Sequence, residues 1–252
     1  MSDKKKVKIA FFDFADCEGC QLQLTYLNEA FLGVLAHCDI VNFREAMSER
    51  SDDYDIAFIE GSITRKHDEE RLKKIRENAK IIIAYGACAC TGGVNGIRRK
   101  YTGDEAKEIV YKGREFPLEA GCPKPVHEVV KVDYYIHGCP TNNDETVEAL
   151  KGILLGKGYT PPDHAVCVEC KLKENVCLYE KGQVCMGPIT RAGCGAWCTS
   201  YGNTCYGCRG MISNPHKDGQ IDILKNNGYT VDELLQKFDL YNKCRMEAEK
   251  NV

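Results

Sequence analysis

Eight cysteines lie within the 42 residues from 167 to 208, and their regular spacing raises the question of what holds them together. They divide into C-x2-C-x6-C-x7-C and C-x3-C-x6-C-x2-C, which is two sets of four. The first set is Cys167, Cys170, Cys177 and Cys185, and the second is Cys194, Cys198, Cys205 and Cys208. Four thiolates suit a [4Fe–4S] cluster or a structural zinc ion. Exchange of ligands between the two sets, as in two-cluster ferredoxins, is also open.

Four further cysteines follow predicted strands in the first half of the chain. They are Cys17 and Cys20 in DCEGC, Cys88 in YGACAC and Cys139 in HGCP. Loops at the carboxyl ends of parallel strands collect at one edge of the sheet, so these four thiolates are expected to hold one more [4Fe–4S] cluster. The C-x-x-C pair alone would equally suit a redox dithiol at a helix N-terminus.

The remaining cysteines are weaker candidates for ligands. Cys90 competes with Cys88 at the same strand end, but Cys88 directly follows the small pair Gly86-Ala87, which would let a bulky cluster approach the backbone. Cys38, Cys122 and Cys244 have no partner at ligand spacing and are expected to be core or surface thiols.

The elements that position these residues alternate along the first half. Apolar runs rich in β-branched and aromatic residues predict strands at 7–14, 39–43, 55–61, 79–86 and 132–138. Helical patterns lie at 20–35, 66–78 and 143–155. This order predicts an α/β fold, a doubly wound parallel sheet like that of flavodoxin. Residues 90–131 interrupt the rhythm and predict a long surface excursion with short elements.

The composition changes at GKGYTPPDH, residues 156–164. From there to about residue 215 branched aliphatic residues are few, so bound metal is expected to organise the region. The tail, 229–250, is expected to be an amphipathic helix with Thr230 as its N-cap. The predicted domains are 1–158, flavodoxin-like with a proximal cluster, and 159–252, a small irregular iron–sulfur domain with two clusters and a C-terminal helix.

Charge and patterning narrow the function classes. A net charge of −3 and a pI near 6.1 give no bulk attraction to nucleic acid. The first residues, MSDKKKVKIAFF, lack the apolar segment of a secretion signal, and no apolar run has the roughly 18–20 residues that span a membrane. We therefore expect a cytoplasmic protein, in which so many cysteines, sixteen in total, point to metal ligands rather than to disulfides.

The segments CEGCQLQL, IEGSI, YGACACTGG and GCP, followed by the cysteine-rich tail, resemble the small subunits of [NiFe] hydrogenases over roughly 7–210. The resemblance is nearest to the cytoplasmic NAD(P)-linked and electron-bifurcating branch, such as sulfhydrogenase delta subunits. It implies a flavodoxin-like domain whose proximal cluster lies next to the nickel–iron site of a separate large subunit. Matched by motif, the proximal ligands are Cys17, Cys20, Cys88 and Cys139.

The resemblance also implies a distal cluster on the first set of four tail cysteines and a medial cluster on the second. Two departures stand out. Many periplasmic relatives begin the distal set with a histidine, whereas this chain has Cys167 there and His164 three residues earlier. Those relatives carry a three-iron medial cluster, whereas Cys198 supplies a fourth ligand here, so a complete [4Fe–4S] cluster is expected. Its lower potential would suit NAD(P)H or ferredoxin as the redox partner.

Two acids and one aromatic residue stand out near these motifs. Glu18 lies between Cys17 and Cys20, and Glu60 lies in the E-G-S segment after the third strand. As buried acids facing the large subunit they would support proton movement, while capping helices or pairing with lysines is the equally weighted alternative. Trp197, the only tryptophan, is expected to fill the small core of the second half.

These features predict an electron relay with three [4Fe–4S] clusters. The chain carries no terminal C-x-x-C pairs for nickel, so no catalytic residue is expected, and DCEGC replaces a G-x-G-x-x-G motif for nicotinamide or flavin. The expected partners are a [NiFe] hydrogenase large subunit and diaphorase-type subunits with flavin and iron–sulfur centres. The complex would couple H2 oxidation or evolution to NAD(P) or ferredoxin, with no stand-alone activity of this chain.

Two alternatives remain. The cluster subunit of respiratory complex I shares the flavodoxin-like core, but it has adjacent cysteines in its first motif and no ferredoxin-like tail. A zinc-structured scaffold with a redox dithiol belongs to a different class, and the metal content would separate it from the relay.

Overall fold

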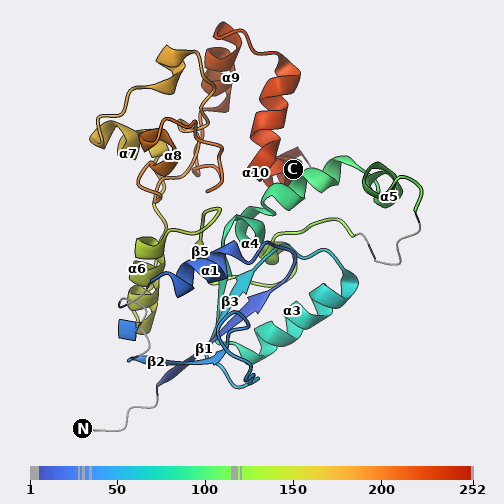
Figure 1. Cartoon of the computed structure of the whole chain (residues 1–252), viewed down its shortest axis with the longest axis vertical. Helices are drawn as coiled ribbons and strands as arrows, with labels where there is room; N and C mark the ends of the chain where they lie inside the picture. The colour runs from blue at the N-terminus through green and yellow to red at the C-terminus, as the bar shows by residue number, and fades with distance from the viewer. Residues whose placement is uncertain are drawn as a thin grey trace.

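The computed structural model describes residues 6–27, 29, 32–33, 36–114, 119 and 121–250, with 231, 234 and 245–250 described by their backbone alone. Its centre is a parallel sheet in the order β2-β1-β3-β4-β5 (Figure 1). The strands are β1 (Val7–Asp13), β2 (Cys38–Asn42), β3 (Ile56–Glu60), β4 (Ile81–Tyr85) and β5 (Tyr134–Ile136). This is the strand order of flavodoxin, so the predicted fold class is confirmed.

Helices cover both faces of the sheet, because each strand is apolar on both sides. Successive strand residues point to opposite faces, so Ile82 and Ile83 of β4 lie in different cores. The helices α1 (Gly19–Thr25) and α6 (Asn143–Leu154) pack over the face of Ile83. On the other face lie α3 (Lys66–Asn78) and α4 (Ala87–Thr91). The two cores therefore extend to the segments that carry the cysteines.

The predicted helices of the first half differ from the observed ones mainly at 20–35. There α1 ends at Thr25 and a turn follows at 26–27. Residues 29 and 32–33 are helical again, while residues 28, 30–31 and 34–35 lie outside the described residues. The excursion at 90–131 has short elements as predicted. They are η1 (Val94–Lys100), α5 (Gly103–Tyr111) and η2 (Val126–Glu128).

The second half carries more regular structure than the sequence indicated. Its elements are α7 (Val166–Leu172), η3 (Leu178–Lys181), α8 (Trp197–Ser200), α9 (Lys217–Asn226) and α10 (Val231–Lys250). Residues such as Met186, Ile189 and Leu224 form a small core with the buried thiols Cys185 and Cys205. Aliphatic residues, scarce as they are in this region, therefore build a core in which cysteines take part.

The C-terminal helix begins as predicted. The Glu233 N–H donates to Thr230 Oγ1 at 3.3 Å, and the Thr230 N–H donates to Glu233 Oε2 at 2.9 Å. This reciprocal pair is a capping box, which satisfies two donors at the helix start.

From there α10 runs back toward the first half and packs against η1 and α4 (Figure 1). An ion pair of 2.9 Å joins Lys100 to Asp239, and Cys244 lies against Gly92 and Gly96. Gly92 has a φ of +83°, and a Cβ there would collide with the Cys244 thiol. The two halves therefore share an interface, and a domain boundary at 158/159 stays a prediction.

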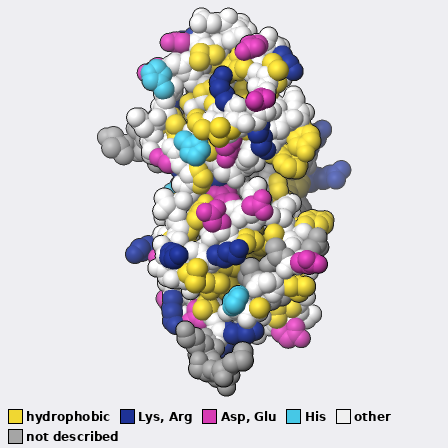
Figure 2. Space-filling model, turned by 90° about the vertical axis from the view of Figure 1, so that its left-hand side faces the viewer, with side chains coloured by type: hydrophobic (Ala, Val, Ile, Leu, Met, Phe, Trp, Pro, Cys, Tyr) yellow, Lys and Arg dark blue, Asp and Glu magenta, His cyan; other side chains and the backbone are white. Residues whose placement is uncertain are grey.

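Exposed hydrophobic side chains lie in both halves of the face in Figure 2, scattered among charged ones. Within the described ranges, we find no helix whose length and hydropathy would allow it to cross a membrane.

The two-faced core gives a direct stability test. Replacing Ile83, which is fully buried in β4, with alanine leaves a cavity and should lower the free energy of unfolding by about 2–5 kcal/mol. The matched change Ile109→Ala lies on α5, where the side chain is 59% exposed, and should stay within about 0.5 kcal/mol of the parent protein. Guanidinium unfolding followed by circular dichroism measures both. Equal losses in the two variants would contradict this placement of the core.

Candidate metal centre

The four cysteines of the first half surround one cavity of about 210 Å³, called the first cavity here. Its thiols come from the segments that follow β1, β4 and β5: Cys17 and Cys139 lie in loops, Cys20 in α1 and Cys88 in α4. Cys20 is buried and Cys88 half-buried, whereas Cys17 and Cys139 are exposed at the rim. The parallel sheet thus brings together the four thiols that the sequence places after separate strands.

Glu60 holds the start of α1 against this cavity. Its carboxylate accepts hydrogen bonds from the N–H groups of Cys20 and Gln21, both at 2.9 Å. These are N–H groups of the first helical turn, which have no partner inside the helix. Burial raises the pKa of Glu60 to about 7, and the two N–H groups oppose this rise. Glu60 is therefore both buried and a helix cap, while its support of proton movement toward a large subunit stays a prediction.

Glu18 behaves differently from the buried acid that the sequence allowed. Its side chain is only partly buried and forms an ion pair with Arg44, which also binds Asp13 at 2.9 Å. A hydrogen bond with Glu45 and then partial burial raise the pKa of Glu18. A position beside a loop cysteine does not by itself bury a side chain, so the expectation of burial is wrong for Glu18.

The structure separates Cys88 from its rival Cys90. Cys88 lines the first cavity, and burial raises its pKa to about 12. Cys90 points into the core, where its thiol contacts the carbonyl oxygens of Ala84 and Ile136 at 3.4 and 3.5 Å. Gly86 has a φ of +88°, and a Cβ there would collide with the Cys20 thiol. The preference for Cys88 thus agrees with the geometry.

The second set of tail cysteines surrounds a larger cavity of about 460 Å³, called the second cavity here. All four thiols line it, namely Cys194, Cys198, Cys205 and Cys208. Cys139 lines this cavity as well as the first one. Burial raises the pKa of Cys208 to about 12, although a hydrogen bond from the Cys139 backbone lowers it. Cys139 therefore lies between the two cavities.

The first set of tail cysteines forms a third group, centred on α7 and the segment after η3. Burial raises the pKa of Cys167 to about 11, and the nearby thiols Cys185, Cys170 and Cys177 raise it further. The Cys205 N–H donates to Cys185 Sγ at 3.3 Å, which links this group to the second cavity. A Cβ at Gly187 would lie 3.2 Å from the Cys167 thiol, so the backbone approaches this group closely.

The donor chemistry fits iron–sulfur clusters. Burial and neighbouring thiols favour the neutral form of several of these cysteines, whereas coordinated metal removes the proton from a thiol. Across the described parts of the chain, no three His, Cys, Asp or Glu side chains converge as they would around one ion. The thiols around the first and second cavities leave room for a group of several atoms, whereas a zinc ion holds its ligands at about 2.3 Å.

Several residues of the site carry no sequence signal. The Tyr241 hydroxyl on α10 hydrogen-bonds Cys139, and Asn95 lies 4.0 Å from the Cys88 thiol. Arg209 lines the second cavity beside Cys208. Trp197 was expected in the core but is 62% exposed at the edge of this cavity, where its ring centroid lies 4.9 Å from that of Tyr201. The expectation for Trp197 is therefore wrong.

The close backbone approach at Gly86 gives a test of the first cavity. Gly86→Ala should remove about four irons per chain from anaerobically purified protein, because the new Cβ displaces the Cys20 thiol. Gly156→Ala is the matched control, since its φ is +70° and nothing lies within 4 Å. Both variants place a side chain at a positive φ, +88° at Gly86 and +70° at Gly156, but only the first should lose iron in a colorimetric assay. Full iron content in Gly86→Ala would contradict this role of the cavity.

Comparisons with known proteins identify the family. The family described as NADH ubiquinone oxidoreductase, 20 Kd subunit, matches residues 17–153. Sulfhydrogenase 2 subunit delta of Pyrococcus furiosus is 36% identical, covering 96% of this chain and 99% of the relative. A subunit of the F420-non-reducing vhu hydrogenase of Methanocaldococcus jannaschii is 34% identical, covering 94% of each chain.

A solved structure agrees with these relatives. A chain of an NAD+-reducing [NiFe]-hydrogenase in the H2-reduced state superposes with a TM-score of 0.56 and 26% identity, covering 62% of this chain and 96% of the other. The chain therefore belongs to the 20 Kd subunit family and, within it, to the hydrogenase small subunits that include sulfhydrogenase delta.

Proposed function

We propose that this hydrogenase subunit relays electrons between the nickel–iron site of a large subunit and partner subunits that react with NAD(P) or ferredoxin. The observation that carries the proposal is that the three groups of thiols adjoin one another, the first next to the second and the second next to the third. Cys139 lines both the first and the second cavity, and the Cys205 N–H bonds Cys185 of the third group. A chain of redox centres requires such adjacency, because electrons pass between neighbouring groups.

Each group is proposed to hold one [4Fe–4S] cluster, so the chain carries three. The first cavity would hold the proximal cluster, the second cavity the medial one and the third group the distal one. The clusters supply reversible one-electron redox chemistry when bound, with potentials set by hydrogen bonds and exposure around them. The protein residues hold the clusters at fixed separations and limit the access of water.

The proximal end is proposed to face the large subunit. Leu22 and Tyr26 of the α1 region line the first cavity and are 38% and 67% exposed. Exposed apolar side chains of this kind suit a partner surface. Glu60 is proposed to hold a proton at this end, because burial raises its pKa to about 7. Glu18 lies nearer the surface and is proposed to support proton movement at this end through its ion pair with Arg44.

The distal end is proposed to face subunits with flavin and iron–sulfur centres. Val168, Leu172 and Val176 are exposed beside the third group and offer an apolar surface there. The NAD+-reducing hydrogenase with the same fold supports NAD(P) as an acceptor, and ferredoxin is the other candidate. This arrangement would operate in the cytoplasm, where the thiols stay reduced before the clusters assemble.

A complex I-like cluster subunit is the main alternative within the same family. The family match ends at residue 153, before the eight tail cysteines, so it covers only the shared flavodoxin-like core. The two hydrogenase relatives extend over nearly the whole chain, including the tail. The tail therefore favours the hydrogenase relay.

The metal content tests the proposal against the zinc scaffold. The anaerobically purified protein should be brown, with broad absorbance near 400 nm and about twelve irons per chain, because three clusters hold four irons each. Metal analysis and absorbance spectra measure this directly. A colourless protein that contains zinc would overturn the relay.

Cys198 decides the type of the medial cluster. Cys198→Ala removes one of four ligands at the second cavity and should convert that cluster to a three-iron form, with a new EPR signal in the oxidised protein. Cys122→Ala changes an exposed thiol and should leave the spectrum unchanged. A three-iron signal already present in the unaltered oxidised protein would show that Cys198 is not a ligand.

A further inference from the structure

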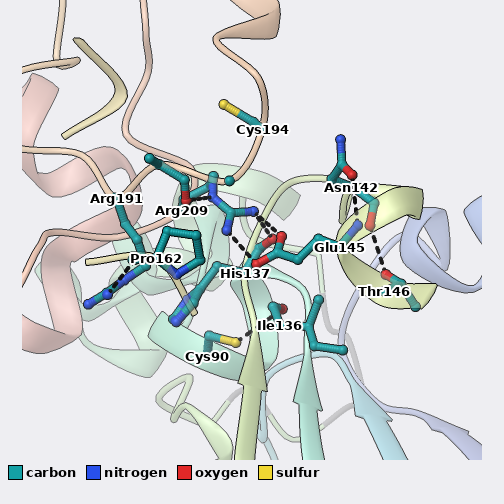
Figure 3. Close-up of polar contacts among 12 residues, drawn as sticks. Cys90, Ile136, His137, Asn142, Glu145, Thr146, Pro162, Arg191, Cys194 and Arg209 are labelled. Carbon is teal, nitrogen blue, oxygen red and sulfur yellow. Dashed lines mark hydrogen bonds and ion pairs between the residues drawn. The ribbon is translucent and has the colours of Figure 1, made fainter. Parts of the chain in front are cut away.

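Arg209 is a charged residue with almost no exposure to solvent, and it directly follows the cavity cysteine Cys208. Its side chain is 1% exposed and that of its partner Glu145 is 7% exposed. Both guanidinium Nη atoms donate to the Glu145 carboxylate, at 2.6 and 2.7 Å (Figure 3). The two side chains therefore form a buried bidentate ion pair between the halves of the molecule.

The same guanidinium binds two further cysteine loops. Its Nη1 also donates to the carbonyl oxygen of His137 at 2.6 Å (Figure 3). Its Nε donates to the carbonyl oxygen of Ala192 at 2.7 Å. His137 lies two residues before Cys139, and Ala192 lies two residues before Cys194. One side chain thus connects the loop shared by the first and second cavities with two ligand segments of the second cavity.

The position of this guanidinium is fixed from several sides. Glu145 lies in the first turn of α6, where Asn142 Oδ1 accepts its N–H at 3.0 Å, and the Tyr159 hydroxyl donates to its carboxylate. A Cβ at Gly193, whose φ is +112°, would collide with the guanidinium. The surroundings leave the ion pair a single arrangement, and α6 connects it to the sheet.

Stability alone is a weak reason for such a pair. Moving two charges out of water costs about as much free energy as their attraction provides. Apolar replacements of similar size are therefore often neutral or stabilising for the fold. A bidentate arginine instead fixes orientation, because its planar fork matches the carboxylate. Since Arg209 lines the second cavity and Glu145 does not, the positive end lies nearer the bound group.

We propose that Arg209, anchored by Glu145, is a positioning residue that sets the separation of the proximal and medial clusters and raises the potential of the medial one. This inference rests on the proposed three-cluster relay. It assigns to Arg209 the role of holding the proximal and medial clusters at a fixed separation. The positive charge stabilises the reduced, more negative cluster, which favours transfer of an electron from the proximal step.

The test separates charge from geometry in the purified complex. The double variant Arg209→Met, Glu145→Leu removes both charges while keeping apolar volume. It should retain about twelve irons per chain, lose the EPR broadening that arises from magnetic coupling of the proximal and medial clusters, and shift the medial midpoint potential downward. Arg209→Lys keeps the charge and should lose the coupling with little change in potential.

A matched control removes another ion pair, Lys124 with Glu69, which are 2.7 Å apart and line neither cavity. Lys124→Met, Glu69→Leu should leave iron content, coupling and potential unchanged. An iron-replete Arg209→Met, Glu145→Leu variant with parental coupling and potential would overturn the positioning role. Loss of iron from this variant would overturn it as well, because the pair would then be needed to hold the cluster rather than to set its separation and potential. Absence of iron from the unaltered protein would instead contradict the proposed function.

Discussion

The loop that carries Cys139 constrains the rest of the molecule, because it belongs to two cavities at once. Its sulfur lines the first cavity, its backbone N–H bonds the Cys208 thiol, and the carbonyl oxygen of nearby His137 is held by Arg209. These three contacts restrict the movement of the loop. The two halves of the chain therefore meet at this point, and α10 adds to the interface through Tyr241 and its packing against η1 and α4.

The parallel sheet explains why the first cavity lies where it does. Strands that all run the same way deliver their following loops to one edge, so cysteines far apart in the sequence come together there. The fine geometry needs more than topology. Glu60 holds the first turn of α1 through two N–H groups, and the missing side chain of Gly86 leaves room for the Cys20 thiol.

The sequence predicted the five strands and the grouping of twelve cysteines, because buried parallel strands and ligand spacing are local patterns. It did not predict Arg209 with Glu145, since these residues are separated by 64 positions and neither stands in a motif. The exposed position of Trp197 was missed for a similar reason, because burial of a large side chain depends on neighbours that composition does not reveal. The short helix α9 was also not predicted.

In the second half, buried thiols are part of the apolar core. Its core contains Met186, Ile189 and Leu224, but Cys185 and Cys205 are buried among them, so thiols replace part of the aliphatic volume. Burial raises the pKa of both thiols, which keeps them neutral until metal binds. Under the proposed assignment these two cysteines belong to different clusters and are joined by a 3.3 Å hydrogen bond. Loss of either cluster would then disturb the apolar core and the other cluster together, so the distal and medial steps would form as one unit.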